Sequence, residues 1–317
     1  MSSPNEVSSR DMNQNKKLSY QDCLVWTALI TPFDEHHQVD YQQLTMLAQQ
    51  QADAGNGILL LGSTGESLSL TVEEQLTIVE TISELALAVP IMVGIGGYNL
   101  AQQKQMLSDC NQLAVDAFLL GATLYAKPNV HGQQMWYQAL LDKAEKPCML
   151  YNVPSRSGIN LSVEALANLQ QHPNCWALKE ASGQIEQFLQ YRKHCPQVSL
   201  YSGEDALMPV LQSVGAKGLV SVAANVWPQQ THRYVEHCLH GNTQSVFPVW
   251  HDAVQALFDV ANPIPVKTLM HLKGLIQTPE LRLPLSANDL TAIEPLQLAD
   301  QQIQQWHLSQ SSLRQSA

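Results

Sequence analysis

The sequence predicts an α/β fold, a closed (β/α)8 barrel followed by a C-terminal helical extension. Three observations carry this prediction. Eight short apolar runs recur along the chain, and each is followed by a turn of small residues and then an amphipathic stretch. The ends of successive runs lie 19 to 33 residues apart, as one strand with its crossover helix requires. No run is followed by a G-x-G-x-x-G fingerprint, which disfavours the main alternative, an open doubly wound sheet with a dinucleotide site.

The eight apolar runs are expected to be parallel strands buried on both faces, because their apolar character is nearly continuous. They lie at 25–31, 57–62, 90–95, 116–121, 147–151, 175–179, 198–203 and 217–222. The segments between them have helical periodicity. In 71–88, for example, Val72, Leu76, Val79 and Ile82 share one stripe behind an acidic first turn.

The ends of the chain differ in character from the barrel. Residues 1–20 are rich in Ser, Asn and Gln without a hydrophobic period, which predicts a flexible N-terminal tail. After residue 226 the strand pattern stops, and helical patterns continue at 231–241, 245–260 and 265–276. The predicted division is therefore a tail at 1–20, a catalytic barrel at 21–226 and a helical region at 227–317.

Composition narrows the class of protein. The 317 residues are 45% hydrophobic and 14% charged, which excludes a disordered polymer. The formal net charge of −11, without a basic run, argues against partners such as nucleic acid or an anionic membrane. The six cysteines form no C-x-x-C pair, and the N-terminus lacks the apolar core of a signal peptide. We expect free thiols in a soluble cytoplasmic protein.

The active sites of such barrels lie at the C-terminal ends of the strands, so the residues there are the candidates for catalysis. The second run ends in GSTGE, where glycines allow a tight turn and Ser63 and Thr64 offer N–H groups and hydroxyls for an anion; a plain turn is the alternative. The sixth run carries Lys179 after four nearly apolar residues. This lysine is either a partner in an ion pair or a desolvated amine suited to Schiff-base chemistry.

The fifth run ends at Tyr151, which places it beside Lys179 on the predicted rim. Tyr151 opens YNVPSRSG, in which Pro154 and Gly158 fix a turn and present Arg156. A tyrosine can relay a proton to a carbinolamine, and an arginine can bind a carboxylate with two hydrogen bonds. Taken singly, a rim tyrosine packed over the barrel and an exposed arginine are the more ordinary interpretations, but their conjunction with an apolar lysine is much less ordinary.

Two other groups of residues carry titratable or metal-ligating side chains. Glu204 and Asp205 could form an acid/base pair, but we expect them to bind the N–H groups of the helix that they precede. His237, Cys238 and His240 lie within four residues, but the first two point to different helix faces and no acidic ligand is near. We expect no metal site there.

Taken in order, GSTGES, YNVPSRSG, KEASG, YSGED, GLVSVAAN and NPIPVK resemble the dihydrodipicolinate synthase branch of the pyruvate-dependent class I aldolases, over about residues 24 to 285. The resemblance implies condensation of pyruvate with L-aspartate 4-semialdehyde in diaminopimelate and lysine synthesis, without a cofactor, in a homotetramer built as a dimer of dimers. N-acetylneuraminate lyases share the segment up to YNxP but usually lack the arginine. The alternatives to this function are another pyruvate Schiff-base lyase, of the N-acetylneuraminate or sugar-acid aldolase type, and a non-catalytic binding homologue.

The resemblance also implies roles for single residues. Lys179 matches the Schiff-base lysine, and Tyr151 the tyrosine that shuttles protons. Ser63 and Thr64 match the pair whose N–H groups hold the pyruvate carboxylate, and the Thr64 hydroxyl joins the proton relay. The remaining matches are Arg156 for the carboxylate of the semialdehyde, with Gly203 and Val220 as backbone positions lining the site.

Two features depart from the family pattern. The segment TLYAKP is one residue shorter than usual, so either Tyr125 or Ala126 could occupy the place of a relay tyrosine that acts across a dimer interface; we favour Tyr125 because Pro128 anchors the following turn. Regulated members bind lysine at that interface through His, Asn and Glu. The matching positions here are Val72 or Gln75, then Tyr98 and Gln102, so we expect no lysine inhibition unless Glu73 or Glu74 substitutes.

Overall fold

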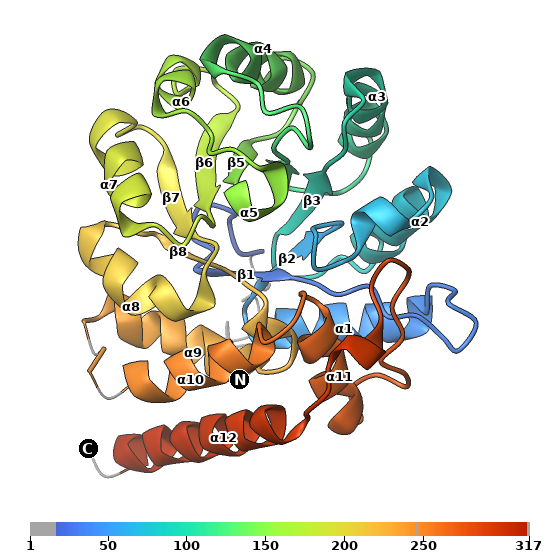
Figure 1. Cartoon of the computed structure of the whole chain (residues 1–317), viewed down its shortest axis with the longest axis vertical. Helices are drawn as coiled ribbons and strands as arrows, with labels where there is room; N and C mark the ends of the chain where they lie inside the picture. The colour runs from blue at the N-terminus through green and yellow to red at the C-terminus, as the bar shows by residue number, and fades with distance from the viewer. Residues whose placement is uncertain (1–16, 242, 245, 316–317) are drawn as a thin grey trace, which may run out of the picture.

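A computed structural model describes residues 17–241, 243–244 and 246–315. Eight parallel strands close into a barrel in the order β1 to β8, with β8 paired to β1, which confirms the predicted fold class (Figure 1). Each predicted run coincides with one strand, and β5 and β6 extend one residue beyond the run predicted for them. The strands are β1 Val25–Ala28, β2 Gly57–Leu60, β3 Ile91–Ile95, β4 Ala117–Leu120, β5 Cys148–Asn152, β6 Cys175–Glu180, β7 Ser199–Ser202 and β8 Gly218–Ser221.

Alternate residues of each strand face two different apolar layers. One set fills the barrel interior, where the Trp176 ring meets Tyr201 and Trp26 edge to face at centroid distances of 5.7 and 6.4 Å. The other set packs outward against the helices and forms the larger core. The strands read as continuous apolar runs because both faces are buried.

The helices surround the barrel (Figure 1). Sequence signals at their ends explain where they begin: α2 starts with a capping box in which Thr71 and Glu74 exchange side-chain and backbone hydrogen bonds. The barrel helices are α1 Tyr41–Asp53, α2 Val72–Ser83, α3 Leu100–Asn111, α4 Val130–Leu141, α5 Pro154–Ser157, α6 Val163–Leu169, α7 Ile185–His194, α8 Met208–Leu211 and α9 Pro228–Leu239. Short 3₁₀ turns are η1 Ser67–Ser69, η2 Asp205–Leu207, η3 Gln212–Val214, η4 Ala223–Asn225 and η5 Ala287–Asp289.

The N-terminal end of the barrel is covered by residues that the sequence assigned to the tail. Leu18 donates its N–H to the Ala88 carbonyl, and Tyr20 packs edge to face on Trp176 at 4.9 Å. Lys17 pairs with Asp116 at 2.7 Å. The prediction of a flexible tail is therefore wrong for 17–20, because Leu18 and Tyr20 pack against the residues inside the barrel. Residues 1–16 lie outside the described residues.

The helices after residue 226 fall into two groups. α9 packs against β8 and β1, as the last helix of the barrel ring. α10 Phe247–Leu257, α11 Ile264–Leu272 and α12 Glu294–Gln315 follow, and α12 lies along α10 (Figure 1). Trp250 of α10 stacks on Tyr234 of α9 at 4.2 Å, which joins the two groups. Within the described residues no helix is both long and apolar enough to cross a membrane.

Candidate active site

Lys179 lies at the C-terminal end of β6, opposite Tyr151 of β5 in the parallel register. Its side chain is buried, and Nζ lies 4.4 Å from the centroid of the Tyr151 ring. No carboxylate within 4 Å pairs with it among the described residues. The lysine is thus held against an aromatic ring rather than in a salt bridge, which leaves its amine available for attack on a carbonyl.

The loop after β2 is the second part of the site. Thr64 is 2% exposed, and its Oγ1 accepts a hydrogen bond of 3.0 Å from Asn262 Nδ2. The Gly65 carbonyl accepts a hydrogen bond of 2.7 Å from Thr31 Oγ1. A Cβ at Gly65 would lie 2.9 Å from the Leu29 carbonyl oxygen, so this position requires glycine. The loop is therefore held by Asn262 at Thr64 and by Thr31 at Gly65.

Behind this loop, Glu66 forms a buried ion pair with Lys267 of α11. Lys267 Nζ lies 2.6 Å from Glu66 Oε1, donates to the Glu280 carbonyl at 2.7 Å, and lies 4.2 Å from the centre of the Phe33 ring. Burial lowers the pKa of Lys267 to about 8, and the charge of Glu66 opposes this shift. Both charges are therefore compensated inside the protein.

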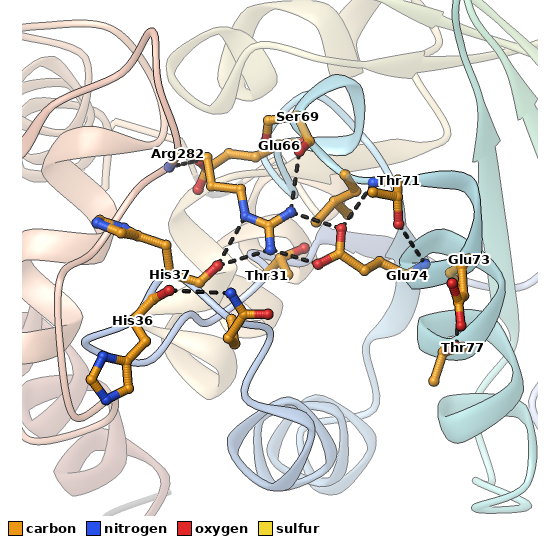
Figure 2. A network of polar contacts seen from close by, with 12 residues as sticks. Thr31, His36, His37, Glu66, Ser69, Thr71, Glu73, Glu74, Thr77 and Arg282 are labelled. Carbon is orange, nitrogen blue, oxygen red and sulfur yellow. Dashed lines mark hydrogen bonds and ion pairs between the residues drawn. The ribbon is translucent and has the colours of Figure 1, made fainter.

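Arg282 extends the network outward (Figure 2). Its backbone N–H donates to Glu66 Oε2 at 3.0 Å, and its guanidinium binds both oxygens of Glu74 at 2.7 and 2.5 Å. It also donates to the carbonyls of Ser69 and His37. The contact with Arg282 lowers the pKa of Glu74 to about 2. The C-terminal helical region is thereby tied to the loop after β2.

A cavity of about 490 Å³ opens at the C-terminal ends of the strands, as expected for this fold. Arg156, on α5, reaches it and donates to the Asn262 carbonyl at 3.5 Å. The lining combines the ends of β2, β5, β6, β7 and β8 with a segment that precedes α11. It consists of Ser63, Thr64, Tyr151, Val153, Ser155, Arg156, Lys179, Ala181, Gly203, Glu204, Val222 and 258–262.

Six residues selected from the sequence line this one cavity, and two do not. The six are Ser63, Thr64, Tyr151, Arg156, Lys179 and Gly203. Val220 is buried with the residues that fill the barrel interior, and Val222 represents β8 in the lining. Tyr125 is 92% exposed on the loop after β4, with φ of 66°. Within the described chain, Tyr125 therefore stands apart from Lys179 and the cavity.

The capping role expected of Glu204 and Asp205 is wrong. Neither caps η2, the helix that they begin. Asp205 instead accepts hydrogen bonds from the Ser221 hydroxyl and from the Val222 N–H at 3.0 Å, at the end of β8. Glu204 lines the cavity. A short 3₁₀ turn presents few free N–H groups, so the two carboxylates are left for other contacts.

Sequence reasoning also missed Asn262 and the neighbouring segment 258–261. They follow the barrel in sequence, where no strand register ties them to the rim. The sequence feature that indicates this segment is the NPIPVK motif, which begins at Asn262. In the part of the chain that the structure describes, no cluster of three or more His, Cys, Asp or Glu side chains could hold a metal ion.

Comparison with known proteins gives a consistent result. A family model described as the dihydrodipicolinate synthetase family matches residues 23–300. The 4-hydroxy-tetrahydrodipicolinate synthase of Francisella tularensis subsp. novicida is 48% identical, over 89% of this chain and 96% of that protein. The corresponding enzyme of Wolbachia pipientis from Culex pipiens is 44% identical over the same shares.

Solved structures agree with this assignment. The dihydrodipicolinate synthase of Acinetobacter baumannii, solved in complex with pyruvate, superposes with a TM-score of 0.84 at 30% identity, covering 89% of this chain and 99% of that one. The enzyme of Cyanidioschyzon merolae, solved with lysine bound, gives 0.82 at 33% identity, covering 89% and 98%. With its barrel, its buried lysine and these relatives, the chain belongs to the dihydrodipicolinate synthetase family.

Proposed function

We propose that this protein is a 4-hydroxy-tetrahydrodipicolinate synthase, which condenses pyruvate with L-aspartate 4-semialdehyde in the diaminopimelate route to lysine. The observation that carries the proposal is the buried amine of Lys179, 4.4 Å from the Tyr151 ring centroid in a cavity that also contains Arg156. Six buried thiols without a disulfide support a cytoplasmic location. We further propose that the barrel extends through α9, with 240–317 as the helical region that completes the site.

In the proposed mechanism, Lys179 attacks the pyruvate carbonyl and water leaves to give an imine. The imine acts as an electron sink, so the pyruvate methyl loses a proton to form an enamine, which attacks the aldehyde. Tyr151 moves protons at the carbinolamine stage. No cofactor is needed, because the protonated imine nitrogen itself accepts the electron pair.

Ser63 and Thr64 are proposed to hold the pyruvate carboxylate through their backbone N–H groups. The contact from Asn262 Nδ2 supports a second role for Thr64. Because the amide donates to Oγ1, the hydroxyl hydrogen of Thr64 stays free to donate into the proton relay. Gly203 is proposed as a backbone contact at the edge of the cavity, whereas Val220 lies outside the lining, among the residues that fill the barrel interior.

Tyr125 is proposed to complete the relay in a neighbouring subunit of a homotetramer. Its 92% exposure and its left-handed backbone support this. Exposed aromatic side chains mark interaction surfaces, and a strained backbone is maintained where its surroundings, here a partner subunit, hold it in place. The strain also favours Tyr125 over Ala126 for the relay position.

The test of this function is borohydride reduction in the presence of pyruvate, followed by intact mass and peptide mapping. We expect one adduct per chain, on the peptide containing Lys179, and none in Lys179→Ala. Side-by-side turnover of L-aspartate 4-semialdehyde and of sugar-derived aldehydes separates this activity from that of another Schiff-base lyase. An adduct on a different lysine, or faster turnover of a sugar aldehyde, would contradict the proposal.

A further inference from the structure

Arg156 is carried by a segment that leaves the rim of the barrel and returns to it. This segment, 153–161, begins directly after β5 and contains α5, and it is called the Arg156 segment below. The side chain of Arg156 does little to hold itself in place, since it is exposed and its hydrogen bond to the Asn262 carbonyl is 3.5 Å long. The position of the guanidinium relative to Lys179 therefore depends on what fixes the backbone of the segment.

Asn152, the last residue of β5, closes the Arg156 segment at its base. Its side chain is fully buried. Oδ1 accepts a hydrogen bond of 2.8 Å from the N–H of Leu161, nine positions along the chain. Nδ2 donates to Asn160 Oδ1 at 3.0 Å and to Glu180 Oε1 at 2.8 Å. Both amide hydrogens and the amide oxygen are thus used to join the end of the segment to the strand where it begins.

The contact with Glu180 ties this base to the neighbouring strand. The parallel register places Asn152 opposite Glu180, the last residue of β6. The preceding pair is Tyr151 with Lys179, whose side chains point to the other face. Glu180 is itself fixed, because its Oε1 also accepts from the Ser182 N–H at 3.1 Å. The base of the Arg156 segment therefore has a defined position relative to the strand that carries Lys179.

Gln133 of α4 holds the same segment from the outside. Its side chain is buried, and Oε1 accepts a hydrogen bond of 2.6 Å from the Ser162 N–H. Nε2 donates to the Asn160 carbonyl at 3.1 Å and to the Pro128 carbonyl at 3.0 Å. Pro128 belongs to the loop after β4, which also carries Tyr125. One buried amide thus fixes the end of the Arg156 segment against α4 and against this loop.

The tip of the segment is compact. Gly158 ends α5 with φ of 75°, and its N–H donates to the Pro154 carbonyl at 2.8 Å. The buried Ser157 hydroxyl lies 2.7 Å from the Ile159 carbonyl oxygen. Short loops whose ends are close together and whose own groups pack inside them behave as units. A shift at the base is therefore transmitted to Arg156 at the tip.

We propose that Asn152 and Gln133 are positioning residues, which fix the Arg156 segment and thereby hold the guanidinium where the condensation requires it. The inference rests on the proposed function. The part of the cavity lining that the structure describes includes neither residue, so both act through Arg156 rather than on a substrate. Two hydrogen bonds from one guanidinium to a carboxylate tolerate little displacement, which makes the position of the segment critical.

The experiment measures the two half-reactions separately in Asn152→Ala and in Gln133→Ala. Borohydride trapping of pyruvate reports imine formation, and kcat/KM for L-aspartate 4-semialdehyde at saturating pyruvate reports the condensation. We expect kcat/KM to fall roughly 10-fold or more in each variant, because small displacements of a positioned group are costly. Trapping should change less than about 3-fold, since the register of β5 and β6 holds Tyr151 and Lys179.

A double-mutant cycle shows whether the loss passes through Arg156. In an Arg156→Ala background, Asn152→Ala or Gln133→Ala should lower kcat/KM by less than about 2-fold further, because the group that they would displace is already absent. A residue with a merely structural role would add its full loss in that background. Additive losses, or equal damage to trapping and condensation, would overturn the proposal.

Asn56→Ala is the matched control. Asn56 is as buried as Asn152, and its amide is used as fully: Nδ2 donates to Gln51 Oε1 at 3.1 Å and to the Pro228 carbonyl at 3.2 Å, and Oδ1 lies 2.9 Å from His232 Nδ1. It directly precedes β2, so it lies at the end of the barrel opposite the cavity. In urea denaturation it should lose stability much as Asn152→Ala does, while both half-reactions are retained.

The remaining outcomes are also decisive. If Asn152→Ala does not fold, Gln133→Ala carries the same test, because its side chain reaches the segment from α4 without belonging to a strand. Full condensation activity in the folded variants, or a selective loss of condensation in Asn56→Ala, would contradict the inference and leave the proposed function intact. If the wild-type protein forms the pyruvate adduct but does not turn over L-aspartate 4-semialdehyde, the proposed function itself fails, and the inference falls with it.

Discussion

Two loops on the same rim of the barrel are built in opposite ways. The loop after β2 carries Thr64, which is 2% exposed, and Glu66, whose φ of 52° is strained but held by Lys267. The loop after β4 carries Tyr125, with φ of 66° and 92% exposure, and no ion pair of the described chain holds it. Backbone strain persists only where the surroundings fix it. One loop is therefore completed within the chain, and the other is where the proposed neighbouring subunit would complete the site.

The largest effect is expected from removing the buried ion pair between Glu66 and Lys267, which holds the loop after β2. Lys267→Met leaves the Glu66 carboxylate buried without its cation, which should lower the free energy of unfolding by about 3 to 5 kcal/mol. Urea denaturation measures the loss. Glu66→Gln combined with Lys267→Met should lose less than Lys267→Met alone, because no charge remains buried. An equal or greater loss in the double variant would show that packing, not charge, dominates.

The second loop is tested by Tyr125→Phe. Loss of a proton relay should lower kcat roughly 10²-fold, with imine trapping retained. The specific activity of the wild-type protein should also fall on dilution. Analytical sedimentation over the same concentrations should show the subunits dissociating. A fully active monomer, or an unimpaired Tyr125→Phe, would place the relay elsewhere. Tyr98→Phe, another exposed tyrosine, is the matched control and should retain its activity.

Between the loops, Arg156→Ala should separate the two half-reactions. The lost carboxylate contact is expected to cost about 1.5 to 3 kcal/mol in kcat/KM for the semialdehyde. Pyruvate trapping should be nearly unchanged, because the contacts proposed for the pyruvate carboxylate lie in the loop after β2. Equal damage to trapping and condensation would refute this division. Arg156→Lys keeps the charge without the two-pronged geometry and should recover only part of the activity.

The ion pair between Glu74 and Arg282 should stabilise the protein to an extent that depends on pH. Glu74→Gln removes the partner of Arg282 and should cost about 1 kcal/mol of stability at neutral pH. The pKa of Glu74 is lowered to about 2 in the folded state, so this stabilisation is present above the ordinary carboxyl pKa. It should be lost as the pH falls from about 5 to about 2. Urea titrations across that range check whether variant and wild type converge.

The smallest expected effect concerns L-lysine, which we expect not to inhibit at millimolar concentrations. Gln75 donates to the Ser67 and Leu70 carbonyls, and Tyr98 is exposed where an asparagine was expected in regulated relatives. Glu74 is occupied by Arg282, so it does not supply the missing carboxylate. A lysine titration of condensation is the measurement. Saturable inhibition would show that a different acid, such as Glu73, serves the pocket.

Much of this arrangement could be predicted from the sequence, for a physical reason. Strands buried on both faces leave an uninterrupted apolar pattern, so Tyr151 and Lys179 could be placed at neighbouring strand ends. Side-chain contacts made across the fold leave no such pattern. Glu204 was expected to cap a helix, and Asn262 contacts Thr64 across 198 residues of sequence. Tyr20 was assigned to a tail, because a local polar composition does not reveal the aromatic ring that it covers.

The contact between Glu66 and Lys267 spans 201 positions of the chain, which has a consequence for biosynthesis. A ribosome completes all eight strands well before it adds Lys267 and Arg282. Until those residues emerge, Glu66 has no cation in its buried position, and the loop that would receive pyruvate is not locked. The nascent barrel therefore carries the proposed Schiff-base lysine, Lys179, without a finished binding loop. Catalytic competence arrives only with the last part of the polypeptide, so truncated products are expected to be inactive as well as unstable.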